Sequence, residues 1–334
     1  MKPLLILTER ERESIFDALA TISSNPYLEY QDFAASVTDL IASRRVPRPF
    51  LVALERVRSD RRDGASVVHV LRNCPIDRDL PDLGNDDPMA RKHELKKTFI
   101  GEALLELCAQ LTGTPLLAYA RNRGDFFTDV VAIDRFSGTL TGYSDSELYY
   151  HNDRTAHEVR ADYIALLGLR CPGKDLIYTG FIDGRDLLEE CAASTLSVLR
   201  EPYFITPFDV YSRDKNNSLT VSKRHPILEN DHSFRYLDTS TTVAPGSPER
   251  AKDALLDMKN ALTRVTRTRH RILEGDLLLL ANQDGLHSRE KVEVVDPTQV
   301  RSRWLLKTYA FRDEAARASH REKWLDGVPG RVAD

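Results

Sequence analysis

The sequence predicts an α+β protein in which a helical N-terminal region precedes a core of short strands arranged as a jelly roll, or double-stranded β-helix. Helical periodicity dominates the first third of the chain, and short β-type segments follow from about residue 126. Strands separated by long excursions favour two stacked layers over an alternating βαβ sheet. The glycine-rich patterns of nucleotide-binding loops are missing from the sequence, so a nucleotide cofactor has no support.

The first third is expected to contain helices and one strand. Thr8 and Glu11 form a capping-box pattern before the apolar positions Ile15 and Leu19. The other elements expected here are a helix that includes Phe33, Val37, Leu40 and Ile41, a helix over Pro49–Arg58, a strand over Val67–Leu71 and a long helix over residues 91–112.

Short apolar runs bounded by turn-forming residues indicate the strands of the core. They are Phe127–Ile133, Asp162–Leu169, Leu176–Ile182, Phe234–Leu237, Leu277–Ala281 and Trp304–Phe311, with helical stretches expected at Arg185–Leu199 and Pro248–Thr268. The whole chain, residues 1–334, is expected to form one domain. Its parts are a mainly helical region over residues 1–120, a jelly-roll core with insertions over residues 121–312 and a tail over residues 313–334.

Composition bounds the class of protein. The 334 residues are 41% hydrophobic and 29% charged, as in an ordinary globular protein, and no apolar run is long enough to span a membrane. A net charge of −4 gives no reason to expect nucleic acid or an anionic membrane as partner. The four cysteines are scattered without a C-x-x-C pair, and the apolar stretch in Met1–Leu7 is too short for a secretory signal. A reducing cytoplasm is therefore expected.

A histidine and a carboxylate two residues apart suggest a metal site. His151 and Asp153 would face the same side of an extended segment, and His287, after a buried-strand pattern, is the best third ligand. Two imidazoles and one carboxylate are the ligand set of non-haem iron(II) oxygenases. Taken alone, H-x-D is equally well explained as a polar loop. A competing pair, His320 and Glu322, sits in a charged helix-like tail with no later histidine to complete a triad.

The longer segment His151–Arg170 resembles the metal-ligand segment of the clavaminate synthase-like branch of the TauD/TfdA superfamily of iron(II)/2-oxoglutarate oxygenases. That branch includes hydroxylases of free amino acids. Two further segments match in the same order, Gly275–Arg289 and Arg303–Lys307. The resemblance implies Fe(II), 2-oxoglutarate and O₂ as metal and co-substrates, and three ordered motifs are a far stronger signal than one.

The resemblance also implies roles for individual residues. Arg303 is expected to bind the distal carboxylate of 2-oxoglutarate, with the hydroxyl of Thr179 on the same group, since a guanidinium binds carboxylates bidentately. Lys307, where relatives tend to carry arginine, is expected to bind the substrate carboxylate. Asp238 resembles an acidic lid residue that meets a polar substrate end, although a turn role explains it equally well. Arg289 is expected to brace the loop of the second histidine or to contact substrate.

The implied reaction is hydroxylation of an unactivated C–H bond of a small molecule, with succinate and CO₂ as co-products. The expected substrate is a free polar or basic L-amino acid, with lysine first and arginine, ornithine or asparagine as other choices. The sequence departs from the closest relatives at Ser288, which replaces a glycine, and at the metal carboxylate, which is Asp rather than Glu. Related halogenases lack that carboxylate, so Asp153 favours hydroxylation over halogenation.

Several alternatives remain open at this stage. The H-N-D segment also resembles the glutarate hydroxylases of the wider superfamily, which makes a small dicarboxylate an alternative substrate. Desaturation or ring closure would use the same oxidative chemistry. A non-catalytic barrel that binds a metal or a metabolite, and a zinc hydrolase, are alternatives of other classes. The last of these lacks an evident general base and leaves Arg303 without a purpose.

Overall fold

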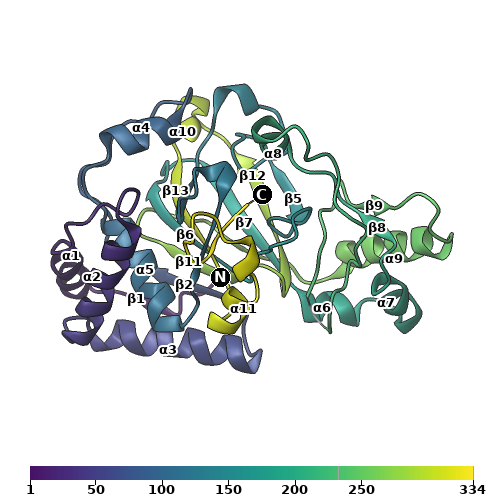
Figure 1. Ribbon diagram of the computed structural model, residues 1–334, viewed down its shortest axis with the longest axis horizontal. Coiled ribbons are helices and arrows are strands. Elements are labelled where there is room, and N and C mark those ends of the chain that lie inside the picture. The colour runs from purple at the N-terminus through teal and green to yellow at the C-terminus, as the bar shows by residue number, and fades with distance from the viewer. Residues whose placement is uncertain (232, 334) are drawn as a thin grey trace.

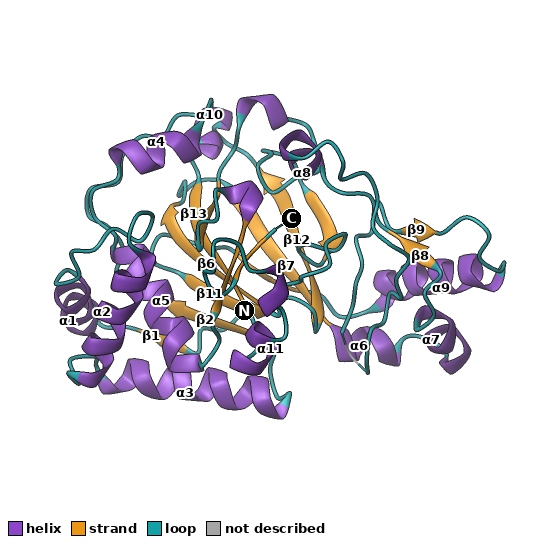
Figure 2. Ribbon diagram, viewed as in Figure 1, coloured by secondary structure: helices purple, strands orange, loops and turns teal. Residues whose placement is uncertain are grey.

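The computed structural model describes residues 1–231 and 233–333. Two β-sheets face each other at the centre of the molecule, with helices on the outside (Figures 1 and 2). The larger sheet has the order β1 (Leu5–Ile6), β2 (Val68–Arg72), β11 (Leu277–Ala281), β6 (Tyr163–Arg170), β13 (Trp304–Ala310), β3 (Leu116–Tyr119) and β14 (Arg331–Val332), and β4 (Phe127–Val130) also pairs with β13. The smaller sheet has the order β10 (Thr268–His270), β7 (Leu176–Asp183), β12 (Gly285–Glu293) and β5 (Leu148–His151).

The chain alternates between the two sheets as a jelly roll requires. β5 lies in the smaller sheet and β6 in the larger one; β7 and β10 return to the smaller sheet, β11 lies in the larger, β12 in the smaller and β13 in the larger. Phe181 of β7 packs with residues of β6 and β11 in the core between the sheets. The predicted fold class is confirmed, with two open sheets rather than a closed barrel.

Strand β11 shows why an unbroken apolar run forms here. It pairs with β2 on one side and β6 on the other, and all five of its residues are buried. Leu277 and Leu279 point to the helices on the outer face, whereas Leu278 and Leu280 point into the core between the sheets. A strand that is covered on both faces has no position for a polar residue.

The helices of the N-terminal region cover the outer face of the larger sheet (Figure 1). The capping box predicted at Thr8 and Glu11 is confirmed, with each side chain bonded to the other residue's backbone N–H. The helices of this region are α1 (Glu9–Leu19), α2 (Tyr30–Ala42), α3 (Arg48–Asp63), α4 (Pro88–Leu95) and α5 (Ile100–Thr112).

The single helix predicted over residues 91–112 is wrong, because the chain breaks between α4 and α5. Lys96 is extended, and its ammonium reaches Asp77 at 2.9 Å and Glu102 at 2.7 Å. The carboxylate of Asp77 also accepts the backbone N–H groups of Ile100 and Gly101, at 3.1 and 3.2 Å. A carboxylate distant in sequence thus caps α5, and this contact has no local sequence signal.

A helical insertion projects from the smaller sheet (Figure 1). The projecting part contains α6 (Gly184–Glu189), α7 (Ala193–Leu199), α9 (Arg250–Arg264) and the short pair β8 (Phe204–Ile205) and β9 (Thr242–Val243), whereas α8 (Val210–Lys215) lies apart from them (Figure 1), with Tyr211 packed on Phe136 and Tyr143. The stretch Arg185–Leu199, predicted as one helical run, is two helices. The strand predicted at Phe234–Leu237 is wrong: these residues make only isolated bridges, because Phe234 and Tyr236 are buried against the insertion.

The C-terminal part closes the edge of the larger sheet. α10 (Pro297–Arg301) precedes β13, and α11 (Glu314–Ala318) precedes β14, which runs parallel to β3. Within the described part of the chain, every helix is too short or too polar to traverse a lipid bilayer.

Candidate metal centre

Two neighbouring strands of the smaller sheet each bring a histidine to the same place. His151 ends β5 and His287 lies in β12, and their Cα atoms are direct partners across the antiparallel pair. The two imidazole rings are 4.3 Å apart between centroids. His287 therefore lies on a strand rather than in the polar loop expected for it. The sequence did not predict β12, because charged residues such as Arg289 and Glu290 interrupt the apolar pattern that is typical of a strand.

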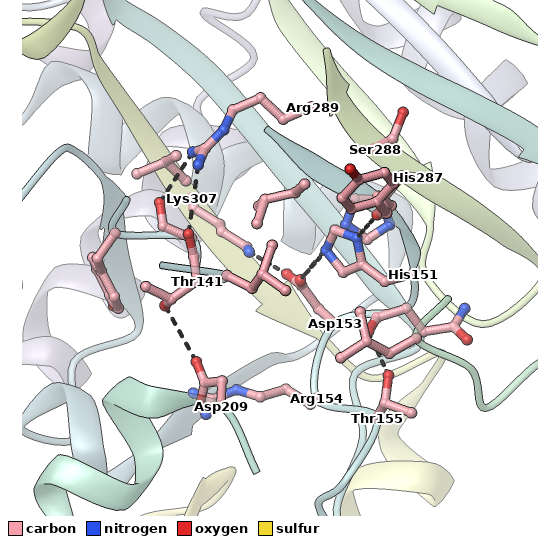
Figure 3. Close-up of a pocket in the computed structure, with 18 of the residues that line it drawn as sticks. Thr141, His151, Asp153, Arg154, Thr155, Asp209, His287, Ser288, Arg289 and Lys307 are labelled. Atoms are coloured by element: carbon pink, nitrogen blue, oxygen red, sulfur yellow. Dashed lines mark hydrogen bonds and ion pairs between the residues drawn. The ribbon is translucent and has the colours of Figure 1, made fainter. Parts of the chain in front are cut away.

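Asp153 completes a cluster of three potential ligands. Its Oδ1 lies 3.3 Å from Nε2 of His151 and 3.6 Å from Nε2 of His287, and one ligand atom from each residue falls within 4.8 Å of the others (Figure 3). The structure therefore brings together the residues that the sequence predicted as a triad.

Asparagine side chains join the two segments that carry these residues. Asn152 donates from its amide to the carbonyls of Asn282 and Gly285, at 2.6 and 2.8 Å. The backbone N–H of Asp153 donates to the side chain of Asn282 at 2.8 Å. Both asparagines are buried, so these bonds fix the distance between the two segments. Asn152 and Asn282 belong to the resembling motifs, but nothing local to them indicated this role.

The donor set fits a divalent iron. Burial, then the neighbouring His151, lowers the pKa of His287 to about 4, so its imidazole is neutral and has a lone pair to offer. Burial alone would raise the pKa of Asp153, but Lys307 and the two histidines hold it well below its usual range. Nδ1 of His151 lies 2.7 Å from the carbonyl of Tyr149, which leaves Nε2 to face the cluster. Two neutral imidazoles and one carboxylate are the donors of a facial iron(II) site.

A pocket between the two sheets contains the triad (Figure 3). Arg303, immediately before β13, lines this pocket, and burial lowers the pKa of its guanidinium. Among the described residues, no hydrogen bond or ion pair engages its side chain. Thr179 of β7 lines the same pocket, and its Cα is the direct partner of Arg289 across the sheet. A buried guanidinium that faces a ligand cavity suits a carboxylate ligand.

Arg289 has a structural contact within the chain. Its guanidinium donates to the carbonyls of Ser144 and Ser146, at 2.6 and 2.8 Å, and also to that of Gly142. It thus fastens residues 142–146, the loop before β5, rather than the loop of the second histidine.

Comparison with known proteins identifies the family. Residues 98–309 match the taurine catabolism dioxygenase TauD, TfdA family. The chain belongs to this family. It is an Fe(II)/2-oxoglutarate-dependent dioxygenase, and the recognition of the superfamily from its ordered motifs is confirmed.

Individual relatives of the dioxygenase extend this result. An L-asparagine oxygenase of Streptomyces coelicolor is 27% identical over 258 residues, which cover 76% of this chain and 74% of that protein. A structure of asparagine oxygenase with Fe(II), 2S,3S-3-hydroxyasparagine and succinate has a TM-score of 0.80 at 21% identity and covers 99% of each chain. The non-haem iron oxygenase OrfP in complex with Fe and alpha-ketoglutaric acid has a TM-score of 0.76 at 20% identity, covering 98% of this chain and 99% of that one. These structures share the fold.

Two residues of the dioxygenase that were expected to contact substrate, Lys307 and Asp238, lie in different pockets. Lys307 of β13 lines the pocket, but its ammonium is paired with Oδ2 of Asp153, which Tyr309 also contacts at 3.0 Å (Figure 3). Asp238 is not brought to the metal pocket. It lines a separate pocket, where the hydroxyl of Tyr236 donates to it at 2.5 Å and Lys259 lies 3.7 Å away.

Four charged residues that line the pocket were missed by the sequence reasoning, and one of them, Asp129, pairs with Lys92 at 2.6 Å. The other three are Arg121, Arg154 and Asp209, and Asp209 also caps α8 by accepting the backbone N–H of Ser212. They come from three distant stretches, so no spacing connects them. The one local signal is that Arg154 directly follows the metal carboxylate; its backbone has a φ of 64°, a left-handed conformation that costs energy for a residue with a Cβ.

Proposed function

We propose that this dioxygenase hydroxylates an unactivated C–H bond of a free amino acid, with Fe(II) held by His151, Asp153 and His287. The observation that carries the proposal is the convergence of two Nε2 atoms and one carboxylate oxygen in a pocket that is also lined by the buried guanidinium of Arg303. The relatives support the substrate class, because the structure of asparagine oxygenase is a complex with hydroxyasparagine and succinate, and one structure of OrfP is a complex with (3S)-hydroxy-L-Arg.

We further propose that Arg303 and Thr179 bind the distal carboxylate of 2-oxoglutarate. The guanidinium supplies a planar fork for two parallel hydrogen bonds, and burial strengthens them. Iron and 2-oxoglutarate, when bound by these residues, would supply the oxidation of the C–H bond by O₂, with succinate and CO₂ as co-products. The protein's part is to orient both carbon substrates beside the metal and to exclude water.

The second oxygen of Asp153 supports this assignment. Lys307 and Tyr309 occupy Oδ2, so Oδ1 alone is directed toward the histidines. A carboxylate held in this way would offer iron a single oxygen beside the two imidazoles, which suits a site that must also accept 2-oxoglutarate and O₂.

The test is an anaerobic titration of the protein with Fe(II) and then 2-oxoglutarate, followed by visible absorption. Chelation of iron by the keto acid is expected to give a weak metal-to-ligand charge-transfer band. Addition of the true substrate should shift that band and, with O₂ admitted, release succinate. Well-folded protein without the band would contradict the proposal and favour a metal-binding or metabolite-binding barrel without catalysis.

Two wider inferences accompany this function. The helical region, the core and the C-terminal tail form one folding unit, which the shared apolar cluster between α1, α2, α3, α5 and the larger sheet supports. A reducing compartment such as the cytoplasm is the inferred location, because all four cysteines are free and two of them, Cys74 and Cys108, are buried as thiols.

A further inference from the structure

The guanidinium of Arg289 in β12 is enclosed by the backbone of the loop that precedes β5. It donates to four carbonyls, those of Ser144 at 2.6 Å, Ser146 at 2.8 Å, Gly142 at 3.2 Å and Thr141 at 3.5 Å. Figure 3 shows the guanidinium directed toward the segment that carries Thr141. Because the planar fork gives each hydrogen bond a fixed direction, these contacts determine the path of residues 141–146 (the 141–146 loop).

The 141–146 loop forms part of the wall of the metal pocket. Thr141, Gly142 and Tyr143 line this pocket. Tyr143 is buried, and its ring packs on that of Tyr211 at 4.3 Å between centroids. The strand that follows the loop, β5, ends at the metal ligand His151. The position of the loop therefore sets the shape of the space beside the metal in which an amino acid would bind.

The residues proposed to bind 2-oxoglutarate adjoin the residues that hold this loop. Thr179 is the direct partner of Arg289 across the sheet. Arg303 follows Arg301 by two positions, and Arg301 donates to the carboxylate of Asp145, within the loop, at 3.0 Å. Arg289 and Arg303 also line the same pocket, and burial, then the charge of Arg303, lowers the pKa of Arg289 to about 9. Arg289 is therefore still protonated at neutral pH, and two positive charges lie near each other.

A carboxylate bound at Arg303 would change the balance of forces on Arg289. Asp145 attracts Arg289 from the side of the loop, and Arg303 repels it from the side of the cofactor. The distal carboxylate of 2-oxoglutarate would add a negative charge on the cofactor side and offset this repulsion. A guanidinium held more firmly also holds the four carbonyls more firmly. Binding of the cofactor and order in the loop would then share one coupling free energy.

We propose that Arg289 is a positioning residue that couples 2-oxoglutarate to the wall of the substrate space, so that the 141–146 loop is held more firmly when the distal carboxylate is bound. The inference rests on the proposed function and adds a form of regulation to the same site. Arg289 acts through the loop rather than on the reacting atoms.

Hydrogen exchange tests this coupling and does not require the substrate to be identified. Amide exchange of residues 139–147 is measured by mass spectrometry in the anaerobic Fe(II)-loaded enzyme, with and without saturating 2-oxoglutarate. The charge-transfer band reports saturation. In the wild type, exchange should be at least about fivefold slower with 2-oxoglutarate, the lower end of typical couplings between two sites. Exchange that does not respond to 2-oxoglutarate would overturn the inference.

Substitutions in β12 separate coupling from simple support of the loop. Arg289→Gln removes the charge and most of the carbonyl contacts, so the ratio of exchange rates without and with 2-oxoglutarate should fall close to one. Arg289→Lys keeps the charge but makes fewer hydrogen bonds, and its ratio should lie between those of Arg289→Gln and the wild type.

Lys291→Met is the matched control. The ammonium of Lys291 donates to the carbonyl of Asp145 at 2.7 Å, from a position two residues further along β12 than Arg289. Loss of this contact should speed exchange of the loop equally with and without 2-oxoglutarate, so the ratio should remain that of the wild type. A residue that only supports the loop behaves in this way, and a residue that couples it to the cofactor does not.

The failures of the two proposals are distinguishable. If the wild type gives no charge-transfer band, the proposed function falls. If the band forms but Arg289→Gln keeps the wild-type ratio, or Lys291→Met loses it as completely as Arg289→Gln, the coupling inference falls and the proposed function stands. Loss of the band in folded Arg289→Gln would make Arg289 a cofactor ligand and would also overturn the positioning role. Where Arg289→Gln does not fold, Arg289→Lys is decisive, and a wild-type ratio there overturns the inference.

Discussion

His151, Asp153 and His287 show how few residues decide the chemistry of this chain. Their donor atoms lie within 4.8 Å of one another, although the third is more than 130 positions away from the first two. The hydrogen bond at Nδ1 of His151 and the contacts at Oδ2 of Asp153 leave the remaining donor atoms facing one point. Residues that touch the ligands rather than the metal therefore determine the geometry.

Replacement of His287 by alanine should abolish the metal centre. His287→Ala removes one of three donors, and two remaining donors hold iron(II) weakly. The expected result is complete loss of the charge-transfer band with retained folding, measured by visible absorption and circular dichroism. His320→Ala is the control, since His320 belongs to the competing H-x-E pair and stacks on Phe311 away from the pocket. Loss of the band in His320→Ala would contradict the assignment.

Replacement of Arg303 should affect 2-oxoglutarate specifically. Arg303→Met removes two charge-assisted hydrogen bonds, each worth about 1.5–3 kcal/mol, so the Kd for 2-oxoglutarate should rise about 100-fold or more. Arg303→Lys keeps the positive charge but loses the planar fork of the guanidinium. Its Kd for 2-oxoglutarate should therefore lie between those of the wild type and of Arg303→Met. The measurement is titration of the charge-transfer band, with the Kd for Fe(II) as the internal reference. An unchanged Kd for 2-oxoglutarate in Arg303→Met would place the cofactor elsewhere.

At the scale of elements, contacts between distant segments override local propensity. The break between α4 and α5 exists because Asp77 and Lys96 form a buried ion pair that also caps α5. The capping patterns in the sequence of residues 91–112 did not indicate this break. β12 is a similar case, since a strand with charged residues on one face becomes regular only between the partners β5 and β7.

Removing the charge of Asp77 should destabilise the N-terminal helices. Asp77→Asn leaves Lys96, whose side chain is fully buried, with Glu102 as its remaining acidic partner. Loss of one partner from a buried ion pair costs about 3–5 kcal/mol, and urea unfolding should show a decrease of that size. Asp79→Asn, two residues away and exposed, should change stability by less than about 0.5 kcal/mol. An equal decrease in the free energy of unfolding in Asp77→Asn and Asp79→Asn would show that the buried ion pair does not stabilise the helices.

The link between β2, β10 and β11 should make stability depend on acid pH. Burial alone would raise the pKa of Asp276, but hydrogen bonds from His270 and Arg72 hold it below its usual value. A lowered pKa in the folded state stabilises the protein above the unfolded value, ~3.9, and the contribution is lost as the pH falls through the folded pKa.

Asp276→Asn should accordingly lower the free energy of unfolding by about 2–4 kcal/mol at pH 7. The difference in free energy of unfolding between the variant and the wild type should become smaller as the pH is lowered below ~4, because protonated Asp276 then resembles the neutral amide. Urea unfolding at a series of pH values checks this. A gap that stays constant, or widens, on acidification would show that the folded-state pKa is not lowered.

At the scale of the whole molecule, the metal pocket lies between two sheets whose strands alternate along the chain. His287 comes from the smaller sheet and Lys307 from the larger one, so the pocket exists only when both sheets have formed. The helical region packs on the other face of the larger sheet through one apolar cluster. Folding of the core and assembly of the site are therefore the same event.

This arrangement predicts one cooperative unfolding transition. The calorimetric and van't Hoff enthalpies of unfolding should agree. Anaerobic Fe(II) with 2-oxoglutarate should also raise Tm, because only the folded state binds them, and a ligand at about 100 times its Kd stabilises that state by about 2.7 kcal/mol. Differential scanning calorimetry with and without the ligands measures both. Two separate transitions, with one insensitive to the ligands, would show that the helical region folds apart from the core.

Local patterns in the sequence determined the elements whose reasons are local. The Thr8–Glu11 capping box, the helix around Phe33 and the buried strand Leu277–Ala281 follow from capping and periodicity, which act within a few residues. The H-x-D pair, the later histidine and Arg303 could also be predicted, because the ordered motifs fall within a region that matches the family.

Only the tertiary structure decided which charges are available to a ligand. Lys307 appeared from the sequence to be free for substrate, but its ammonium lies on the metal carboxylate. Asp238 faces a different pocket, whereas Arg121 and Asp209, which are 88 positions apart, meet in the wall of the site. The physical reason is that a charge acts through its surroundings, and at distances of 3–4 Å these are set by packing between segments rather than by neighbours in the chain.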